Sequence, residues 1–244
     1  ELQMAILIET MRREGYEFMV SKPQVIIKEE NGNKLEPVES VFLDLEEAHV
    51  GTITEKLSKR KGRMTNLHNN GFGRTVLEFK VPSRGMIGFR NQFLTDTKGS
   101  GILNSLFDSY APWFGDIPQR NSGVIIADRF GKVTPYASLA MADRGELFVD
   151  IGVEVYKGMI VGERNKVGDL DVNIVREKKL TNVRSANKDN TVVPRACKKL
   201  SLDQCIEFIS EDELIEVTPL NLRLRKMELD INKRISQNKK SKEA

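Results

Sequence analysis

The stretch Pro37-Val-Glu-Ser-Val-Phe-Leu-Asp-Leu45 returns later in the chain as Arg74-Thr-Val-Leu-Glu-Phe-Lys-Val-Pro82, and this pair decides the fold of the middle of the protein. Both segments mix apolar and polar residues as half-buried strands do. With a repeat spacing of about 37 residues, Gly62 and Gly99 occupy equivalent positions. A helix that ends at a glycine is therefore expected after each of the two strands. A further strand closes each unit, at Arg63–His68 and at Gly101–Tyr110. Two such βαβ units in tandem predict an α+β, ferredoxin-like split βαβ domain, with helices on one face of a four-stranded antiparallel sheet.

The residues before this repeat form a short helix-and-strand segment. Leu2–Glu14 has apolar residues at helical spacing and Gly15 ends it, while Tyr16–Glu30 is extended up to the turn at Asn31–Asn33. One helix and one strand cannot close a core of their own. We therefore expect residues 1–35 to be the C-terminal part of a truncated α/β domain, followed by the ferredoxin-like domain at 36–117.

Residues 118–244 have a different, β-rich pattern. Short strand-like runs separated by glycines occur at Gly123–Ala127, Val133–Ala140, Glu146–Val155, Met159–Arg164 and Asp171–Val175. They are typical of a small barrel or curled sheet. Three later elements are predicted, a helix at Ser201–Ser210 capped by Ser201 and strands at Leu214–Thr218 and Leu222–Lys226. Gln237–Ala244 is expected to be a frayed tail.

The composition restricts the class of protein. The 244 residues are 39% hydrophobic and 30% charged, with a formal net charge of +3, so polyanion binding would need a local basic patch. Cys197 and Cys205 lack the number and spacing of a disulfide framework or zinc site, which favours a reducing compartment. No apolar run approaches the roughly 18 residues of a membrane span, and the first residues lack a signal-peptide layout. We expect a chain that is neither exported nor membrane-bound.

The charge is distributed unevenly along the C-terminal half. Residues 157–199 carry about +6, residues 200–217 about −6 and residues 218–244 about +5. Two basic blocks therefore flank an acidic helix, and the basic blocks are the first places to look for a polyanion site.

Three clusters of cations are candidate RNA contacts. The loop 176–195 has little periodicity and mixes cations with Asn, Ser and Thr, which suits phosphate and ribose contacts. Its candidate residues, with those that follow it, are Lys178, Lys179, Arg184, Lys188, Arg195, Lys198 and Lys199. The second cluster, at the end of the first repeat helix, is Lys59, Arg60, Lys61 and Arg63, and the third is Arg223 and Arg225 on one face of a strand. A solvated mobile loop and cations that complement a helix dipole are the alternatives.

Motifs for catalysis are incomplete. Lys98-Gly-Ser-Gly101 lacks the spacing and the lysine of a phosphate-binding loop, and His49 and His68 have no metal-ligand spacing. The carboxylates of Asp143 and Glu146 are most simply the turn of a hairpin, although a hydrolase remains an alternative. We expect no complete catalytic centre, metal or cofactor in this chain.

Several motifs resemble one family. They are the opening stretch Glu1–Gly15, Pro82-Ser-Arg-Gly-Met-Ile-Gly-Phe-Arg90, Thr97-Lys-Gly-Ser-Gly101, Leu180-Thr-Asn-Val-Arg184 and Asp212–Pro219 with Leu222–Lys226. In these the chain resembles the BipA (TypA) family of translational GTPases over essentially its whole length. The resemblance implies the end of a domain III-like unit, an elongation factor G domain V-like unit, and a C-terminal domain peculiar to the family.

The resemblance also implies a function. The GTPase domain and a barrel domain would precede Glu1, so GTP and Mg²⁺ would bind in a missing N-terminal half. The full protein would be a ribosome-stimulated GTPase of the bacterial cytoplasm or plastid stroma, linked to stress or cold adaptation and to large-subunit assembly. This chain, expected to be a monomer, would dock on large-subunit rRNA at the factor-binding and A sites, with A-site tRNA a further candidate partner. A protein-interaction or structural module without RNA binding remains the alternative, because the acidic run Glu211–Glu213 would repel phosphate.

Overall fold

The computed structural model describes residues 2–71, 73–117, 120, 122–178 and 196–243. Two compact units make up the chain. The first, called here the middle unit, is residues 23–119. The second, called the terminal unit, combines residues 1–22 with residues 120–244.

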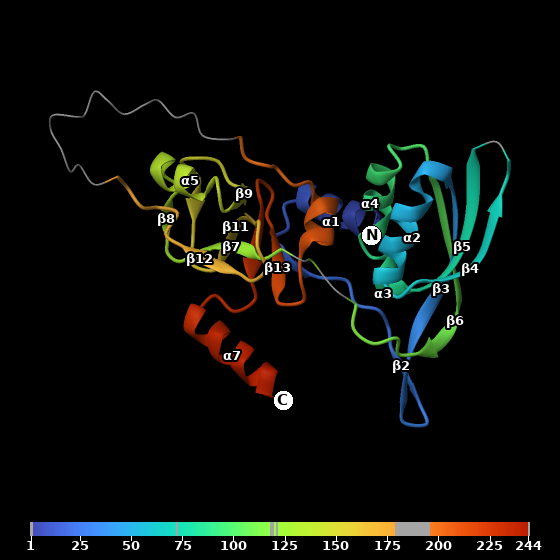
Figure 1. The fold of residues 1–244 in the computed structure, drawn as a ribbon. Helices are drawn as coiled ribbons and strands as arrows, with labels where there is room; N and C mark the ends of the chain where they lie inside the picture. Colours follow the sequence, from blue (N-terminus) through green and yellow to red (C-terminus); the bar gives the residue numbers. More distant parts are fainter. Residues whose placement is uncertain (1, 72, 118–119, 121, 179–195, 244) are drawn as a thin grey trace. The chain divides into compact units, whose positions relative to one another are not determined.

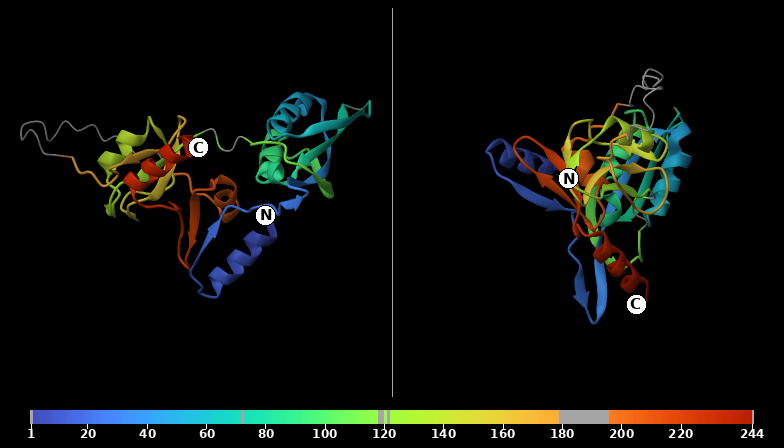
Figure 2. Two further views of the ribbon diagram at one scale, coloured as in Figure 1. Left: turned by 90° about the horizontal axis from the view of Figure 1, so that it is seen from below. Right: turned by 90° about the vertical axis from the view of Figure 1, so that its left-hand side faces the viewer.

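The middle unit has the predicted split βαβ fold. Its antiparallel sheet has the order β6-β3-β5-β4, and the short strand β2 pairs with the start of β3. The strands are β2 (Lys28–Glu30), β3 (Asn33–Glu46), β4 (Arg63–Asn69), β5 (Arg74–Pro82) and β6 (Ile102–Pro112). The helices α2 (Val50–Lys59), α3 (Ser83–Met86) and α4 (Phe89–Asp96) lie on one face of this sheet, and a 3₁₀ turn at Glu47–His49 precedes α2 (Figure 1). The β2–β3 hairpin extends beyond the other strands (Figure 2).

Alternation within the strands explains which face carries the helices. Val41, Leu43 and Leu45 of β3 are fully buried, and Leu77 and Phe79 of β5 lie beside them in the same core. The residues between them face the other side of the sheet, because successive side chains of a strand point to opposite faces. Burial of one face therefore fixes the register of the two central strands.

The terminal unit is built on a sheet with the order β1-β13-β14-β11-β7-β12, to which β9 adds by pairing with β11. Its strands are β1 (Phe18–Ser21), β7 (Val124–Ala127), β9 (Gly145–Leu147), β11 (Met159–Arg164), β12 (Leu170–Val172), β13 (Glu213–Val217) and β14 (Leu222–Lys226). A separate pair joins β8 (Gly131–Lys132) and β10 (Glu154–Val155). The helices are α1 (Leu2–Arg13), α5 (Pro135–Met141), α6 (Leu202–Phe208) and α7 (Ile231–Glu243).

This sheet has a hydrophobic core on each face. All four residues of β7 are buried, with Val124 and Ile126 in one core and Ile125 and Ala127 in the other. Helices α1 and α6 contribute to the first core and α5 to the second. A strand covered on both faces has a continuous apolar run, and β7 has that sequence.

The structure divides the chain differently from the predicted boundaries at 35 and 117. Residues 1–22 pack with the C-terminal half, because β1 pairs with β13 and because Ala5 and Ile8 of α1 enter the core that contains α6. Residues 23–35 join the middle unit through the β2–β3 hairpin, whose turn at Asn31–Asn33 is as predicted. The assignment of residues 1–35 to a domain III-like unit stays a prediction.

Two local predictions are wrong. The run Val133–Ala140, predicted as a strand, contains helix α5, which Thr134 caps by accepting a hydrogen bond from the Ala137 amide at 3.2 Å. Pro135 at the first helical position was the overlooked signal. The predicted tail after Gln237 instead continues helix α7 to Glu243. The sheet of the terminal unit is an open one over its described residues, with β1 and β12 at the ends of the strand order.

Candidate nucleic-acid interface

One end of the middle-unit sheet collects cations from separate parts of the sequence. Here β3 and β4 begin and β5 and β6 end, because all neighbouring strands are antiparallel. The register pairs at this end are Arg63 with Lys80, Val38 with Pro82 and Leu35 with Pro112. Helix α2 also ends here, which places the predicted cluster Lys59, Arg60, Lys61 and Arg63 at this end of the sheet. We call this region the basic end.

Two of the four predicted cations already have partners within the fold. Lys59 forms an exposed ion pair at 2.6 Å with Glu55, one helical turn earlier. The Arg60 guanidinium donates to the carbonyl oxygens of Gly85 at 2.8 Å and Ile87 at 2.9 Å, and it lies over the Phe89 ring. Arg60 therefore holds the connection between α3 and α4, a structural role that the sequence did not indicate.

The other two cations differ in exposure. Lys61 is half-buried, with a left-handed backbone at φ 64°, and Arg63 is exposed at the first position of β4. The Arg63 guanidinium lies 5.1 Å from the centre of the Phe114 ring. Within the described part of the chain, neither cation forms an ion pair with a carboxylate. These two charges are therefore available to an anionic partner.

The predicted cations of the terminal unit are mostly paired. Lys198 lies 3.4 Å from Glu146, and Lys199 lies 3.3 Å from Asp150. Arg225 of β14 pairs with Glu216 of β13 at 3.2 Å. Arg223 shares a face of β14 with Arg225, as the alternation of a strand predicts.

The predicted basic loop is only partly visible. Lys178 is exposed, whereas Lys179, Arg184, Lys188 and Arg195 lie outside the described residues. The segment that leads to this loop is anchored on α5. Thr134 donates its hydroxyl to the Arg176 carbonyl at 2.6 Å, and the Arg176 guanidinium lies 5.7 Å from the centre of the Tyr136 ring.

The acidic run after α6 is largely neutralised. Glu213 is fully buried and accepts two hydrogen bonds from Arg120, at 2.9 and 3.2 Å, while Lys226 lies 2.9 Å away on its other side. Lys226 also lies 2.7 Å from both Asp212 and Asp169. Burial alone would raise the pKa of Glu213, but the Arg120 hydrogen bond and the nearby Lys226 charge hold it below the usual value. Glu213 therefore belongs to a buried network, whereas Asp212 is exposed and paired with Lys226.

The sequence interpretation missed the aromatic residues of the basic end. Trp113 and Phe114 directly follow β6, and each has an arginine over its ring, Arg84 at 3.8 Å and Arg63 at 5.1 Å. The available signal was a pair of aromatic residues immediately after a predicted strand end, next to Gly115. Arg84 was recognised only as part of a family motif.

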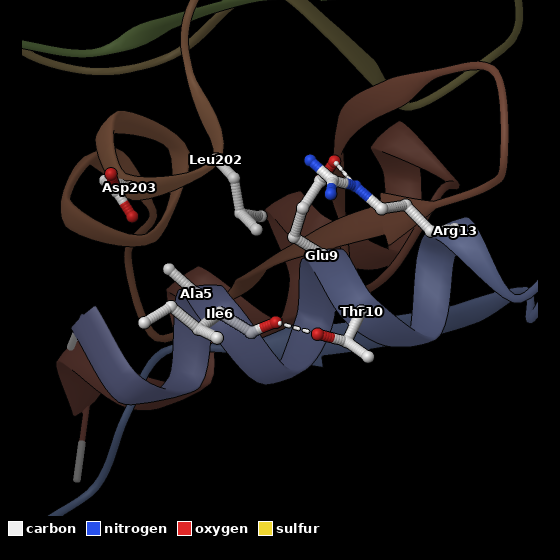
Figure 3. A pocket seen from close by; sticks show the side chains of 7 residues that line it. All are labelled: Ala5, Ile6, Glu9, Thr10, Arg13, Leu202 and Asp203. Carbon is white, nitrogen blue, oxygen red and sulfur yellow. Dashed lines mark hydrogen bonds and ion pairs between the residues drawn. The ribbon is translucent and has the colours of Figure 1, made fainter.

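The terminal unit contains a hollow of its own. It has a volume of about 450 Å³ and is formed by α1 and α6 (Figure 3). Its lining residues are Ala5, Ile6, Glu9, Thr10, Arg13, Leu202 and Asp203. The one cation among them, Arg13, pairs with Glu9 at 3.3 Å, and Thr10 donates to the Ile6 carbonyl. The hollow offers no obvious anion site.

Comparison with known proteins agrees with this architecture. Residues 33–121, essentially the middle unit, match the family model of the elongation factor G C-terminus. The fold and the match together define a protein of the class that carries an elongation factor G-type C-terminal domain. Residues 122–231 match the TypA/BipA C-terminal domain. The chain belongs to the TypA/BipA family.

Relatives at high identity support the same assignment. Over its whole length the chain is 50% identical to a large ribosomal subunit assembly factor BipA of Bacillus subtilis and 46% identical to one of Salmonella typhimurium. It is 50% identical over 92% of its length to a putative TypA-like chloroplastic elongation factor of Arabidopsis thaliana. The chain spans 40% of the two bacterial relatives and 33% of the plant relative. Among the described helices, none has the length and apolarity to cross a membrane.

Proposed function

We propose that this chain is the ribosome-contacting C-terminal portion of a TypA/BipA-type protein and that it acts in assembly of the large ribosomal subunit. The observation that carries the proposal is the basic end of the middle unit, where Arg63 is exposed beside Phe114 and Lys61 is half-buried two residues earlier. Exposed cations of this kind neutralise RNA phosphates and release counterions. The names of the relatives, which are large ribosomal subunit assembly factors, support a ribosomal partner.

The finer parts of the proposal concern the whole protein. We infer a ribosome-stimulated GTPase whose GTP and Mg²⁺ bind outside this chain, while the chain itself performs no chemistry and holds no cofactor. Docking at the factor-binding and A sites, on large-subunit rRNA and near A-site tRNA, would place the basic loop 176–195 against RNA. We also propose that the whole protein is a monomer of the bacterial cytoplasm or plastid stroma. Its role there would be in stress or cold adaptation.

The alternative, a protein-interaction module, loses part of its support. It drew on repulsion of phosphate by Glu211–Glu213, but Glu213 is buried against Arg120, and Asp212 lies 2.7 Å from Lys226. A carboxylate paired with a cation repels an approaching phosphate less than an unpaired one does.

The test is co-sedimentation of the chain with ribosomes and isolated large subunits over a series of salt concentrations. A variant with Lys61→Ala and Arg63→Ala should bind more weakly, with the slope of log affinity against log salt reduced by about 1.5 units. Lys98→Ala is the matched control. Lys98 also has a left-handed backbone, at φ 52°, but it precedes the start of β6 at the opposite end of the sheet.

The outcomes separate the two functions. Salt-sensitive binding that the double variant weakens and Lys98→Ala leaves unchanged supports RNA docking by the basic end. Binding that is insensitive to salt and to the double variant supports the protein-interaction module instead.

A further inference from the structure

The single tryptophan of the chain occupies an unusual position at the basic end. Trp113 follows β6, and 40% of its surface is exposed. Its amide donates to the Lys34 carbonyl oxygen at 3.1 Å, which fixes its backbone to the start of β3. The indole is thus a large aromatic ring on rigid backbone that is only partly covered by its own domain.

Arg84 covers part of the indole and is itself immobilised. Its guanidinium lies 3.8 Å from the centre of the Trp113 ring, and it donates to both carboxylate oxygens of Glu36, at 2.5 and 3.1 Å, and to the Gly115 carbonyl. Glu36 is fully buried and also accepts from the Phe114 amide at 2.7 Å. A bidentate, buried ion pair has little freedom to move. The indole is therefore held in place before any ligand arrives.

Cations lie at the same end of the sheet as this ring. Phe114, the next residue, carries Arg63 over its ring at 5.1 Å, and Lys61 lies two residues before Arg63. Over the described residues, the charges of Lys61 and Arg63 have no carboxylate partner, whereas the charge of Arg84 is matched by Glu36. The arrangement combines an exposed, preorganised aromatic face with cations at the same end of the sheet.

We propose that Trp113 is a stacking platform for an unpaired RNA base, with Arg63 and Lys61 binding the phosphates beside that base. Every nucleobase has a face that can stack on an aromatic ring, and neighbouring cations bind the backbone that carries it. The bases of a continuous duplex are already stacked on one another, so the platform selects a splayed or looped nucleotide. The inference rests on the proposed RNA contact of the basic end and adds to it the kind of nucleotide that is bound.

The test uses Trp113 as its own reporter. A short uridine-rich single strand, whose bases stack weakly on each other, is titrated into the full chain while tryptophan fluorescence is recorded. An RNA duplex of the same length is the comparison. We expect the single strand to quench the fluorescence and the duplex to leave it nearly unchanged.

Variants separate stacking from charge. Trp113→Ala should weaken binding of a labelled single strand about tenfold without changing the salt slope, and Trp113→Phe should restore most of the affinity. The double variant of Lys61 and Arg63 should instead reduce the salt slope. Phe107→Ala is the control. Phe107 is a 60% exposed aromatic residue within β6, the strand that Trp113 follows, and it pairs with Glu39 rather than with the first residues of β3. Far-UV circular dichroism of each variant establishes that it is folded.

The result can overturn this inference without touching the proposed function. If Trp113→Ala and Phe107→Ala weaken the single strand equally, or if the duplex quenches as strongly, Trp113 is not a base platform. Loss of ribosome co-sedimentation by Trp113→Ala with no single-strand binding by the wild-type chain would assign the indole to a protein partner. Failure of the proposed function would appear separately, as wild-type chain that does not sediment with ribosomes at low salt.

Discussion

Replacing Lys226 by Met should destabilise the terminal unit strongly. The Lys226 side chain is only 3% exposed and lies within 2.9 Å of Glu213 and within 2.7 Å of Asp169 and Asp212. Burial alone would lower the pKa of Lys226, but the Glu213 charge and the hydrogen bonds to the two aspartates raise it to about 12. The lysine is therefore fully charged in the folded state at neutral pH.

The magnitude follows from what the substitution leaves behind. Removing one partner of a buried ion pair costs about 3–5 kcal/mol of unfolding free energy, because the other charge stays buried. Glu213 retains Arg120, and the aspartates are partly exposed, so the lower end of that range, about 3 kcal/mol, applies. With an m-value of about 2 kcal/mol per M of urea, the midpoint should fall by about 1–2 M.

Two optical signals distinguish the units. Trp113 lies in the middle unit, so its fluorescence follows unfolding of that unit, whereas far-UV circular dichroism follows both. Lys226→Met should move the circular dichroism transition and leave the fluorescence transition in place. Lys157→Met is the matched control, because Lys157 pairs with Asp230 at 2.6 Å while both side chains are exposed. Equal shifts for the two lysine variants would refute the reasoning from burial.

Three further predictions concern single sites. Burial alone would raise the pKa of Glu213, but its two cationic neighbours hold the pKa below 4.5. The ionised Glu213 therefore stabilises the folded terminal unit above about pH 4.5, and this contribution is lost as the pH falls through the folded pKa. Urea titrations of the terminal unit at a series of pH values should show this loss in the wild type, and Glu213→Gln should remove it. Burial and the hydrogen bond at 2.8 Å to Asp150 raise the pKa of Cys197, so Asp150→Asn should speed its alkylation severalfold, and an unchanged rate would contradict this. Gly85→Ala should lower middle-unit stability by about 1–3 kcal/mol, because its Cβ would lie 2.7 Å from a backbone carbonyl oxygen at the end of α2. Gly51→Ala within α2 meets nothing within 4 Å and should be neutral or stabilising by tryptophan fluorescence, so a loss at both glycines would argue against a local clash.

Local patterns predicted most elements of the middle unit. Strand β5 was expected at Arg74–Pro82 and has those bounds, because alternate residues of a one-sided sheet must be apolar. In the terminal unit, helix α6 was also expected, and Ser201 forms the predicted cap, as a capping box with Gln204. The error at Val133–Ala140 arose because apolar residues were weighed above the helix-start signal of Thr134 and Pro135.

The pairing partner of β1 could not have been identified from the sequence. Strand β1 pairs with β13, almost two hundred residues later, and nothing local to Phe18–Ser21 selects that partner. Long-range strand pairing depends on the shape and burial of both partners, which a single sequence does not display.

The same division holds for the candidate site. The sequence by itself determined the split βαβ fold of the middle unit, the family and the presence of basic clusters, because these depend on residue type and spacing. Only the tertiary structure decided which cations are available, since a charge is neutralised by partners from distant segments. Arg84 donates a hydrogen bond to Glu36, which is 48 residues away in the sequence, and Arg120 donates one to Glu213, which is 93 residues away. Arg63 has Phe114 beside it, and among the described residues neither Lys61 nor Arg63 forms an ion pair with a carboxylate, so both charges remain open to a ligand.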